Sequence, residues 1–544
     1  MTRDTRSFVI EACILVGGLH FALWCWVAFT RFHYPFDVEW MEGGQLGHAL
    51  RLLAGQPIYA RPSADFTAFF YTPLYPALLA LLGKLGLGVS HLTGRGLSVC
   101  ASVATLSLLF WVVRREVGLR YALLGVGLYA SFDRFTGTFS SVARADALAL
   151  ALAFGAVVLA RYGASRTSAA LAGGLAVLAV FAKQTMVLVG AGTLLSLLLW
   201  DRPRARVYAA TTLLGGGLGA WLLEQRSGGW FSFYVLSGHQ HHAFFWQNFF
   251  FYFYRDALVL APLSLLLPLA FTWVDLSRGP LVVLALLHVL GCWVVLALTL
   301  DYPAHMYFRE LAYESPRVLL LVPPALTALA LLRFRHASPS WLRALGAPAA
   351  PAIGYFGVHL LAAVLASAVG HSTQWAYKNA FLPFALFSAL FASLGAASLA
   401  RRGRAAERAL GFAVLVGLVA AFDAPSSRVP SAADHERALA IRLRLARIPG
   451  RVLVLAHPHS AHQHDGSIHL HQMGLSDVAS MGGVSSFDER VRAHFYAAVV
   501  TDEGDGLDVP AVIRENYVPT EALDGPTMKT GVRVRPAWLW LPRR

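Results

Sequence analysis

Residues 34–76 read YPFDVEWMEGGQLGHALRLLAGQPIYARPSADFTAFFYTPLYP and follow the first long apolar run of the chain. Within them, Leu46, Ala49, Leu50 and Leu53 recur at i, i+3, i+4 and i+7, which predicts an amphipathic helix that lies on a membrane surface. The glycine and proline of the GQP that follows should end this helix. The stretch therefore predicts a loop that returns to the membrane rather than a freely solvated connection.

The rest of the chain is strongly apolar. Of its 544 residues, 56% are hydrophobic and 14% are charged, whereas a soluble domain carries roughly 25% charged residues. The formal net charge is +14, but the arginines form short clusters between apolar runs, as in cytoplasmic loops, so we expect no nucleic-acid partner. All the cysteines lie inside apolar runs and indicate neither a disulfide framework nor a zinc site; they are Cys13, Cys25, Cys100 and Cys292.

An apolar run of about 17–25 residues can cross a bilayer as a helix, because a helix satisfies its own backbone polar groups. About thirteen such spans are predicted, and with them every basic cluster falls on the same, cytoplasmic side. One more span at 72–89 would break this agreement, so that stretch is predicted to be re-entrant or interfacial. The predicted spans are 8–30, 95–113, 120–132, 145–160, 168–182, 185–200, 207–223, 257–274, 280–299, 317–332, 352–369, 380–398 and 409–422.

The composition changes after the last predicted span. Residues 431–447 predict an amphipathic helix, and 451–458 and 493–503 predict strands. We therefore expect an all-α polytopic membrane domain over 1–422 and a small soluble α/β domain over 423–544. The basic clusters place this domain on the periplasmic or extracellular side of the cytoplasmic (inner) membrane.

Three carboxylates lie in the first outer loop, residues 31–94, just before the predicted surface helix: Asp37, Glu39 and Glu42. In a structural interpretation, Glu42 complements the N-terminus of the helix and the other two are solvated. In a catalytic interpretation, one of the three is a general base that deprotonates an acceptor hydroxyl at the bilayer surface. The spacing alone leaves both open.

The motifs of this loop resemble a known family. The order E-G-x-x-x-x-x-A-x-x-L-L-x-G-x-P-x-Y, then D-F and P-L-Y-P, is similar to the GT-C class of membrane glycosyltransferases, in the bacterial protein-mannosyltransferase-like group. The matching residues are Glu42, Gly43, Ala49, Leu52, Leu53, Gly55, Pro57, Tyr59, Asp65, Phe66 and Pro73 to Pro76.

The resemblance implies a GT-C-like fold, a polyprenyl-phosphate-linked sugar as donor and an acceptor on the outer face of the cell envelope. Members of the class carry an adjacent Asp-Glu pair in this loop, whereas here Met41 precedes Glu42 and the nearest aspartate is Asp37. The general base is therefore expected to be Asp37 or Glu42, and Glu39 and Asp65 are expected to support it. A flippase of lipid-linked sugars is the alternative, although no internal repeat or midplane charge of a transporter is evident in the sequence.

Cations at the outer membrane boundary suit the phosphate of a lipid-linked donor. Lys183 lies in a very short turn between two spans, Arg144 lies at the outer end of a helix with Asp146 beside it, and Lys378 precedes the next span. We expect the three cations to bind the donor phosphate and Asp146 to support them. The alternative is that they only reach the lipid headgroups from helix ends.

Histidines gather in two outer segments. The spacing H-P-H-x-x-H-x-H fits no standard closed zinc site, so a flexible surface loop is the first interpretation and a divalent-metal site the alternative. No cofactor is assigned from the sequence. The two groups are His239, His241 and His242, and His457, His459, His462, His464, His469 and His471.

The one-sided basic clusters yield a topology prediction. Reporter fusions after Arg120, Arg206 and Arg404 should report the cytoplasm, and fusions after Asp65 and Pro430 should report the outer side. A paired phosphatase and fluorescent-protein reporter at each position makes the measurement. An outer-side signal at Arg206 would contradict the arrangement.

Overall fold

A computed structural model describes residues 8–249, 352–400, 411, 414–419, 421–422, 424–504 and 508–544. Among these residues, five helices are long and apolar enough to cross a bilayer. The chain is therefore membrane-embedded, as its composition predicts. The five are Phe8–Phe32, His91–Val117, Ala145–Tyr162, Gly354–His371 and Lys378–Ala397.

Each predicted span inside the described residues coincides with a helix, but several of these helices are shorter or more polar than a full span. The count of about thirteen spans is therefore not confirmed. The predicted spans 257–274, 280–299 and 317–332 lie outside the described residues, and 409–422 is described only in part. The helices are α1 (Phe8–Phe32), α2 (Glu42–Leu53), α3 (Leu74–Leu82), α4 (His91–Val117), α5 (Leu119–Ser131), α6 (Ala145–Tyr162), α7 (Arg166–Ala182), α8 (Val187–Trp200), α9 (Arg202–Ser227), α10 (Trp230–Ser232), α11 (Gly238–Gln240), α17 (Ala352–His371) and α18 (Leu382–Ala400).

The C-terminal residues form a small mixed sheet with helices around it. The strand order is β1-β2-β4-β3, in which β1 and β2 are parallel and the other neighbours are antiparallel. The predicted helix 431–447 and the two predicted strands correspond to α20, β1 and β2. The elements are α20 (Ala432–Leu445), β1 (Val452–Val454), α21 (Pro458–Asp465), α22 (Gln472–Ala479), α23 (Ser485–Arg492), β2 (Ala498–Gly504), α24 (Ala511–Asn516), β3 (Tyr517–Ala522) and β4 (Val534–Pro542).

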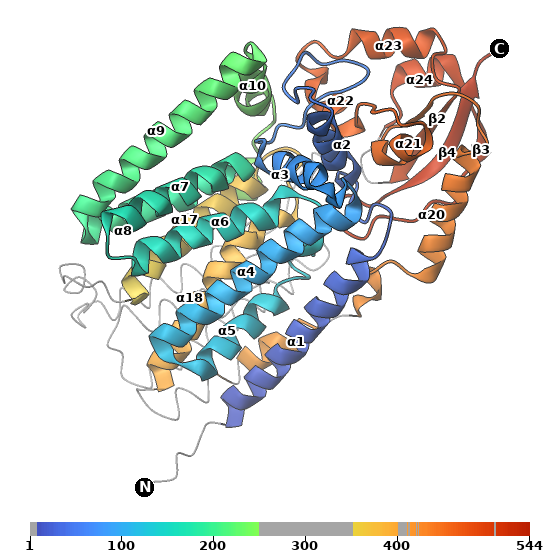
Figure 1. Ribbon diagram of the computed structural model, residues 1–544. Coiled ribbons are helices and arrows are strands. Elements are labelled where there is room, and N and C mark those ends of the chain that lie inside the picture. The colour runs from blue at the N-terminus through green and yellow to red at the C-terminus, as the bar shows by residue number, and fades with distance from the viewer. Residues whose placement is uncertain are drawn as a thin grey trace.

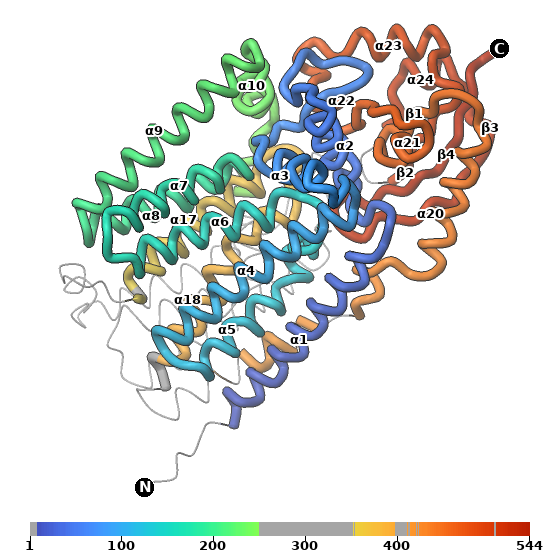
Figure 2. The backbone as a smooth tube through the Cα atoms, viewed as in Figure 1, coloured from blue at the N-terminus to red at the C-terminus, as the bar shows by residue number. Residues whose placement is uncertain are grey.

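The long helices form a bundle, and the sheet with its helices packs over one end of it (Figure 1). The short helices α2 and α3 of the first loop lie between the bundle and the sheet. The N-terminal end of α1 lies at the opposite end of the bundle (Figure 2). The first loop and the C-terminal residues therefore meet at one end of the membrane helices, as the predicted topology requires.

The first loop and the C-terminal residues share one hydrophobic core. Phe66 of the loop and Tyr234, which follows α10, belong to the same buried cluster as Leu453 of β1 and Tyr496. The aromatic segment after α9 thus packs partly against the C-terminal residues. Burial of such aromatic side chains contributes to the free energy that joins the two parts.

A buried ion pair fixes the first loop to the bundle. Arg95 of α4 and Glu42 of α2 are both fully buried, and the guanidinium donates from Nε to Oε1 over 2.8 Å and from Nη2 to Oε2 over 2.6 Å. The backbone N–H groups of Val38 and Ala143 also donate to this carboxylate, over 2.8 and 2.7 Å. Burial raises the pKa of Glu42, but Arg95 lowers it more, so the net shift is downward and Glu42 is ionised.

Arg95 also holds the segment before α2. Its Nη1 donates to the carbonyl of Arg31 over 2.8 Å, and its Nη2 donates to the carbonyl of Phe36 over 2.6 Å. Gly43 lets α21 approach α2 closely, because a Cβ there would lie 3.3 Å from the backbone nitrogen of His459. The E-G of the loop motif therefore has a structural explanation. The carboxylate of Glu42 binds Arg95 of α4, and Gly43 leaves room for the close approach of α21.

Replacing Arg95 should destabilise the fold strongly. Arg95→Ala leaves the Glu42 carboxylate buried without its cation, which costs roughly 3–5 kcal/mol. Thermal unfolding of the purified protein in detergent should therefore show a clearly lowered Tm. The matched control is Arg114→Ala, which removes an exposed arginine from the same helix and should leave the Tm nearly unchanged. Equal Tm values for the two variants would contradict this role of Arg95.

Candidate functional site

A cavity of about 280 Å³ lies where the membrane helices meet the first loop and the C-terminal residues. Apolar side chains of the helices line one part of it, among them Leu150 of α6 and Leu382 of α18. Polar and charged side chains line the rest. Those that bear on the chemistry are Glu39, Tyr71, Arg144, Asp146, Lys183 and Asn379.

Asp146 organises the cations of the cavity. Its carboxylate forms a short ion pair with Nζ of Lys183 and lies 3.5 Å from Nε of Arg144. Asn379 donates from Nδ2 to the same carboxylate over 2.9 Å. Asp146 lies in the first turn of α6, and Lys183 lies in the turn between α7 and α8. One buried carboxylate thus holds two cations side by side in the wall of the cavity.

Arg144 joins this group to the first loop. Its Nη1 donates to Oε1 of Glu39 over 3.0 Å, and its Nη2 donates to the hydroxyl of Tyr71 over 2.8 Å. Arg144 is the N-cap of α6 in an extended conformation, so its side chain leaves the helix axis and reaches the loop. Of the predicted phosphate-binding cations, Arg144 and Lys183 are therefore brought together with the supporting Asp146, and Glu39 joins them.

Glu39 is the carboxylate of the first loop that lines this cavity. It is fully buried, and besides Arg144 it accepts a hydrogen bond from the backbone N–H of Met41 over 3.1 Å. Burial raises the pKa of Glu39 to about 7, although Arg144 opposes the shift. Gly531 lies against it with φ +75°, and a Cβ there would lie 2.9 Å from Oε1. The C-terminal residues thus close over Glu39 without displacing its carboxylate.

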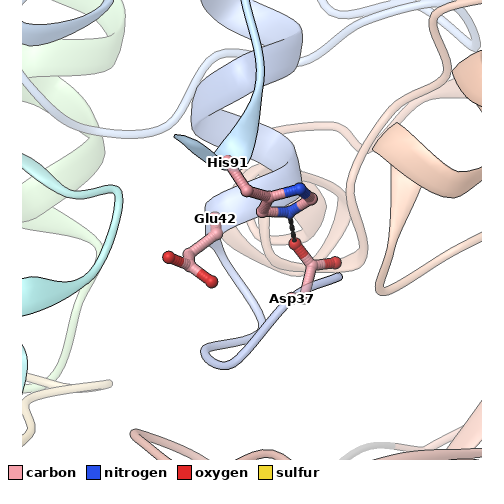
Figure 3. A group of neighbouring side chains, drawn as sticks. All are labelled: Asp37, Glu42 and His91. Carbon is pink, nitrogen blue, oxygen red and sulfur yellow. Dashed lines mark hydrogen bonds and ion pairs between the residues drawn. The ribbon is translucent and has the colours of Figure 1, made fainter. Parts of the chain in front are cut away.

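Asp37 and Glu42, the two predicted bases, do not line this cavity. Glu42 is committed to Arg95, as described above. Asp37 lies between two imidazoles. Its Oδ1 is 2.6 Å from Nε2 of His91 (Figure 3), and its Oδ2 is 2.8 Å from Nδ1 of His457. Burial raises the pKa of Asp37, but the two histidines lower it more, so the net pKa lies well below the usual range. A carboxylate of such low basicity is a poor proton acceptor.

The interpretation of 457–471 as a flexible surface loop is wrong. His457 and three of the other histidines in this segment are buried. His457 and His471 contact the first loop, at the carboxylate of Asp37 and the carbonyl of Trp40. His457 follows β1 and lies between Asp37 and Asp502, with Nε2 2.9 Å from Oδ2 of Asp502. Although burial lowers the pKa of His457, the two carboxylates raise it to about 10, so the ring is an imidazolium. The other buried histidines are His459, His469 and His471.

The predicted alternative, a divalent-metal site in the histidine clusters, does not coincide with the group of possible metal ligands found among the described residues. Among the described residues, Asp37, Glu42 and His91 each offer one ligand atom within 4.8 Å of the others. These atoms are already engaged, because Arg95 holds Glu42 while His91 and His457 hold Asp37. A divalent cation would also lie beside the Arg95 guanidinium, and like charges repel. The residues in this arrangement do not fit a metal, and no step is derived through one.

Two predicted residues lie outside the cavity. Lys378 does not line it, and its neighbour Asn379 does so instead. Asp65 forms a bidentate ion pair with Arg490 of α23, over 2.6 and 2.9 Å, on a partly exposed surface. Lys378 is therefore not placed to bind a donor phosphate in this cavity, and Asp65 joins the first loop to the C-terminal residues.

Sequence reasoning missed several partners that the structure brings to these carboxylates. His91 and Arg95 lie at the start of α4, at the border of the predicted span 95–113. An ionisable residue at the edge of an apolar run is a recognisable signal of function or of a buried pair. Asp477 of α22 and His242 also line the cavity, but nothing local in the sequence indicates that these two distant residues meet.

No family model and no curated protein matches the chain. Among solved structures, it is similar to ArnT from Cupriavidus metallidurans in the apo state, with 13% identity over 97% of both chains and a TM-score of 0.46. The same protein bound to undecaprenyl phosphate matches with 16% identity over 96% of this chain and 97% of that one, with a TM-score of 0.44. The Archaeoglobus fulgidus oligosaccharyltransferase tethered with an acceptor peptide matches with 12% identity over 92% of this chain and 69% of that one, with a TM-score of 0.49.

All three matches are below 25% identity and below a TM-score of 0.5. At these values the likeness carries no argument about class, donor, acceptor or mechanism. The resemblance to GT-C membrane glycosyltransferases therefore stays an expectation from the loop motif, and the protein-mannosyltransferase-like subgroup is not confirmed.

Proposed function

We propose that the chain is a membrane glycosyltransferase that moves a sugar from a polyprenyl-phosphate donor to an acceptor on the outer face of the membrane. The observation that carries the proposal is the cavity itself. It sets two cations, Lys183 and Arg144, and three buried carboxylates together with apolar helix side chains at the end of a membrane bundle. A polyprenyl-phosphate sugar has the same division into an apolar chain, an anionic phosphate and a polar sugar.

Lys183 and Arg144 are proposed to hold the donor phosphate. Both side chains are largely buried, where a charge-assisted hydrogen bond is stronger than in water. Asp146 pairs with both cations and fixes their direction, so little reorganisation is needed when charge builds up on the leaving phosphate. Because a phosphate is a good leaving group, positioning and charge stabilisation contribute more than acid catalysis.

Glu39 is proposed as the general base, in place of Asp37 or Glu42. The acceptor hydroxyl attacks C1 of the sugar as the bond between C1 and the phosphate oxygen breaks, which gives an inverting transfer. Its proton passes to Glu39, and the phosphate leaves as polyprenyl phosphate. A general base works best with a pKa near the working pH, and the pKa of about 7 for buried Glu39 meets that condition.

The direct test is a donor panel. Purified protein in lipid vesicles is incubated with polyprenyl phosphates that carry different hexoses and pentoses, together with a membrane extract as the source of acceptor. Release of polyprenyl phosphate with one of these donors supports the proposal. If every donor stays intact while lipid-linked sugar crosses the vesicle bilayer, the chain is a flippase and the enzyme proposal is wrong.

Glu39→Gln should lower turnover by about 10²–10⁴-fold, because the amide keeps the size of the side chain and loses its basicity. Binding of polyprenyl phosphate should be retained. For the unaltered protein, kcat/KM should fall as the pH drops below about 7, since a protonated Glu39 cannot accept a proton. Glu436→Gln, at an exposed carboxylate of α20, is the control. Full turnover in Glu39→Gln would remove Glu39 from the role of base.

Lys183→Gln should mainly weaken binding of the donor. Losing one charge-assisted hydrogen bond to a phosphate should raise the Kd for polyprenyl phosphate by about ten- to a hundredfold. Titration of the lipid phosphate, followed through the thermal stabilisation that binding produces, measures this Kd. The exposed Lys84 beside α3 provides the control Lys84→Gln. If both variants bind polyprenyl phosphate equally well, the phosphate lies elsewhere.

A further inference from the structure

A second polar group of the cavity is not used in the transfer step described above. Asp477 of α22 and His242, which follows α11, both line the cavity, and Nε2 of His242 lies 3.1 Å from Oδ1 of Asp477. The side chain of Asp477 is 3% exposed and that of His242 is 10% exposed. The two residues are 235 positions apart in the chain, so this contact forms only when the C-terminal residues dock on the membrane part.

The contact leaves hydrogen-bonding capacity on the carboxylate. Among the described residues, His242 is the one side-chain hydrogen-bond partner of Asp477, and it engages Oδ1. A carboxylate can accept about four hydrogen bonds, so Oδ2 can accept bonds from a bound molecule. The ring of Phe70 lies 5.1 Å from the ring of His242 and gives the same corner an apolar surface.

The corner faces the same space as the proposed transfer groups. Tyr71, whose hydroxyl accepts a hydrogen bond from Arg144, lines the same cavity as Asp477. Arg144 and Lys183 are each paired with a carboxylate of the cavity. Asp477 is thus an acidic group of the cavity without a lysine or arginine partner among the described residues.

The geometry points to Asp477, positioned by His242, as the group that recognises the hydroxyls of the transferred sugar. The inference rests on the proposed function and adds the class of sugar. A carboxylate accepts hydrogen bonds from sugar hydroxyls, and Phe70 offers an apolar surface to the C–H face of the ring. The sugar is therefore one that carries no negative charge. A sugar with its own carboxylate, such as a hexuronic acid, is excluded because its charge would be repelled by Asp477.

The test compares two donors on the full-length protein: a polyprenyl phosphate that carries a neutral hexose and one that carries the matching hexuronic acid. The unaltered protein should transfer the neutral sugar with a kcat/KM at least about a hundredfold higher. Asp477→Asn should lower kcat/KM for the neutral donor by about tenfold or more, because a charged hydrogen-bond acceptor is lost. It should also reduce the ratio of kcat/KM between the neutral and the hexuronic acid donor, because the repulsion of the uronic carboxylate is removed. His242→Gln should act in the same direction but more weakly, since it only positions Asp477.

Two controls distinguish recognition from general damage. His241→Gln changes the adjacent, exposed histidine, and Asp488→Asn changes a partly exposed aspartate of α23; both should leave the donor preference unchanged. If Asp477→Asn keeps the full preference, or changes only the KM of the acceptor, the inference is overturned while the proposed function stands. If the unaltered protein transfers neither sugar nor any other donor of the panel, the proposed function falls, and this inference falls with it.

Discussion

The buried ion pair between Arg95 and Glu42 is the contact on which the rest of the site depends. A charge pair with no solvent exposure is tolerated only when its hydrogen bonds are complete, and both oxygens of Glu42 are used by Arg95 and by two backbone N–H groups. Through its other bonds, Arg95 also fixes the backbone before α2. This backbone carries Asp37 toward the C-terminal histidines and Glu39 toward the cavity. A rigid anchor thus gives two carboxylates of one short segment different environments.

The opposite pKa shifts of these two carboxylates follow from their partners. Both are buried, and burial alone raises the pKa of each. Asp37 lies between His91 and the imidazolium of His457, which reverse the effect. Glu39 has one cation, Arg144, which is shared with Asp146 and Tyr71, so burial prevails. Acid–base sites often contain two titratable groups whose environments push their pKa values apart. Here Glu39, the group with the raised pKa, lines the cavity with Lys183 and Arg144.

Much of the fold was predictable from the sequence, because hydropathy and periodicity report on local burial. The long membrane helices, α2, α20, the strands β1 and β2, and the group of Arg144, Asp146 and Lys183 follow from apolar runs and from charges at their ends. The choice of base was not predictable in this way. Asp37, Glu39 and Glu42 lie within six residues, and their environments differ because each contacts a different residue. Glu42 contacts Arg95, Glu39 contacts Arg144, and Asp37 contacts His457, which is 420 positions away in the chain. The burial of His457 was missed for the same reason, since histidine-rich composition says nothing of tertiary contacts.

The central claim is that the donor phosphate binds between Lys183 and Arg144, with the sugar directed toward Glu39. A cryo-electron microscopy structure of the protein with a bound polyprenyl-phosphate sugar tests it most directly. The account predicts phosphate density within hydrogen-bonding distance of both cations and polyprenyl density along the apolar wall near Leu150 and Leu382. A second cavity of about 230 Å³, lined by Asp37 and His457 among others, provides the contrast. Phosphate density in that cavity, with the first cavity left without lipid, would contradict the account.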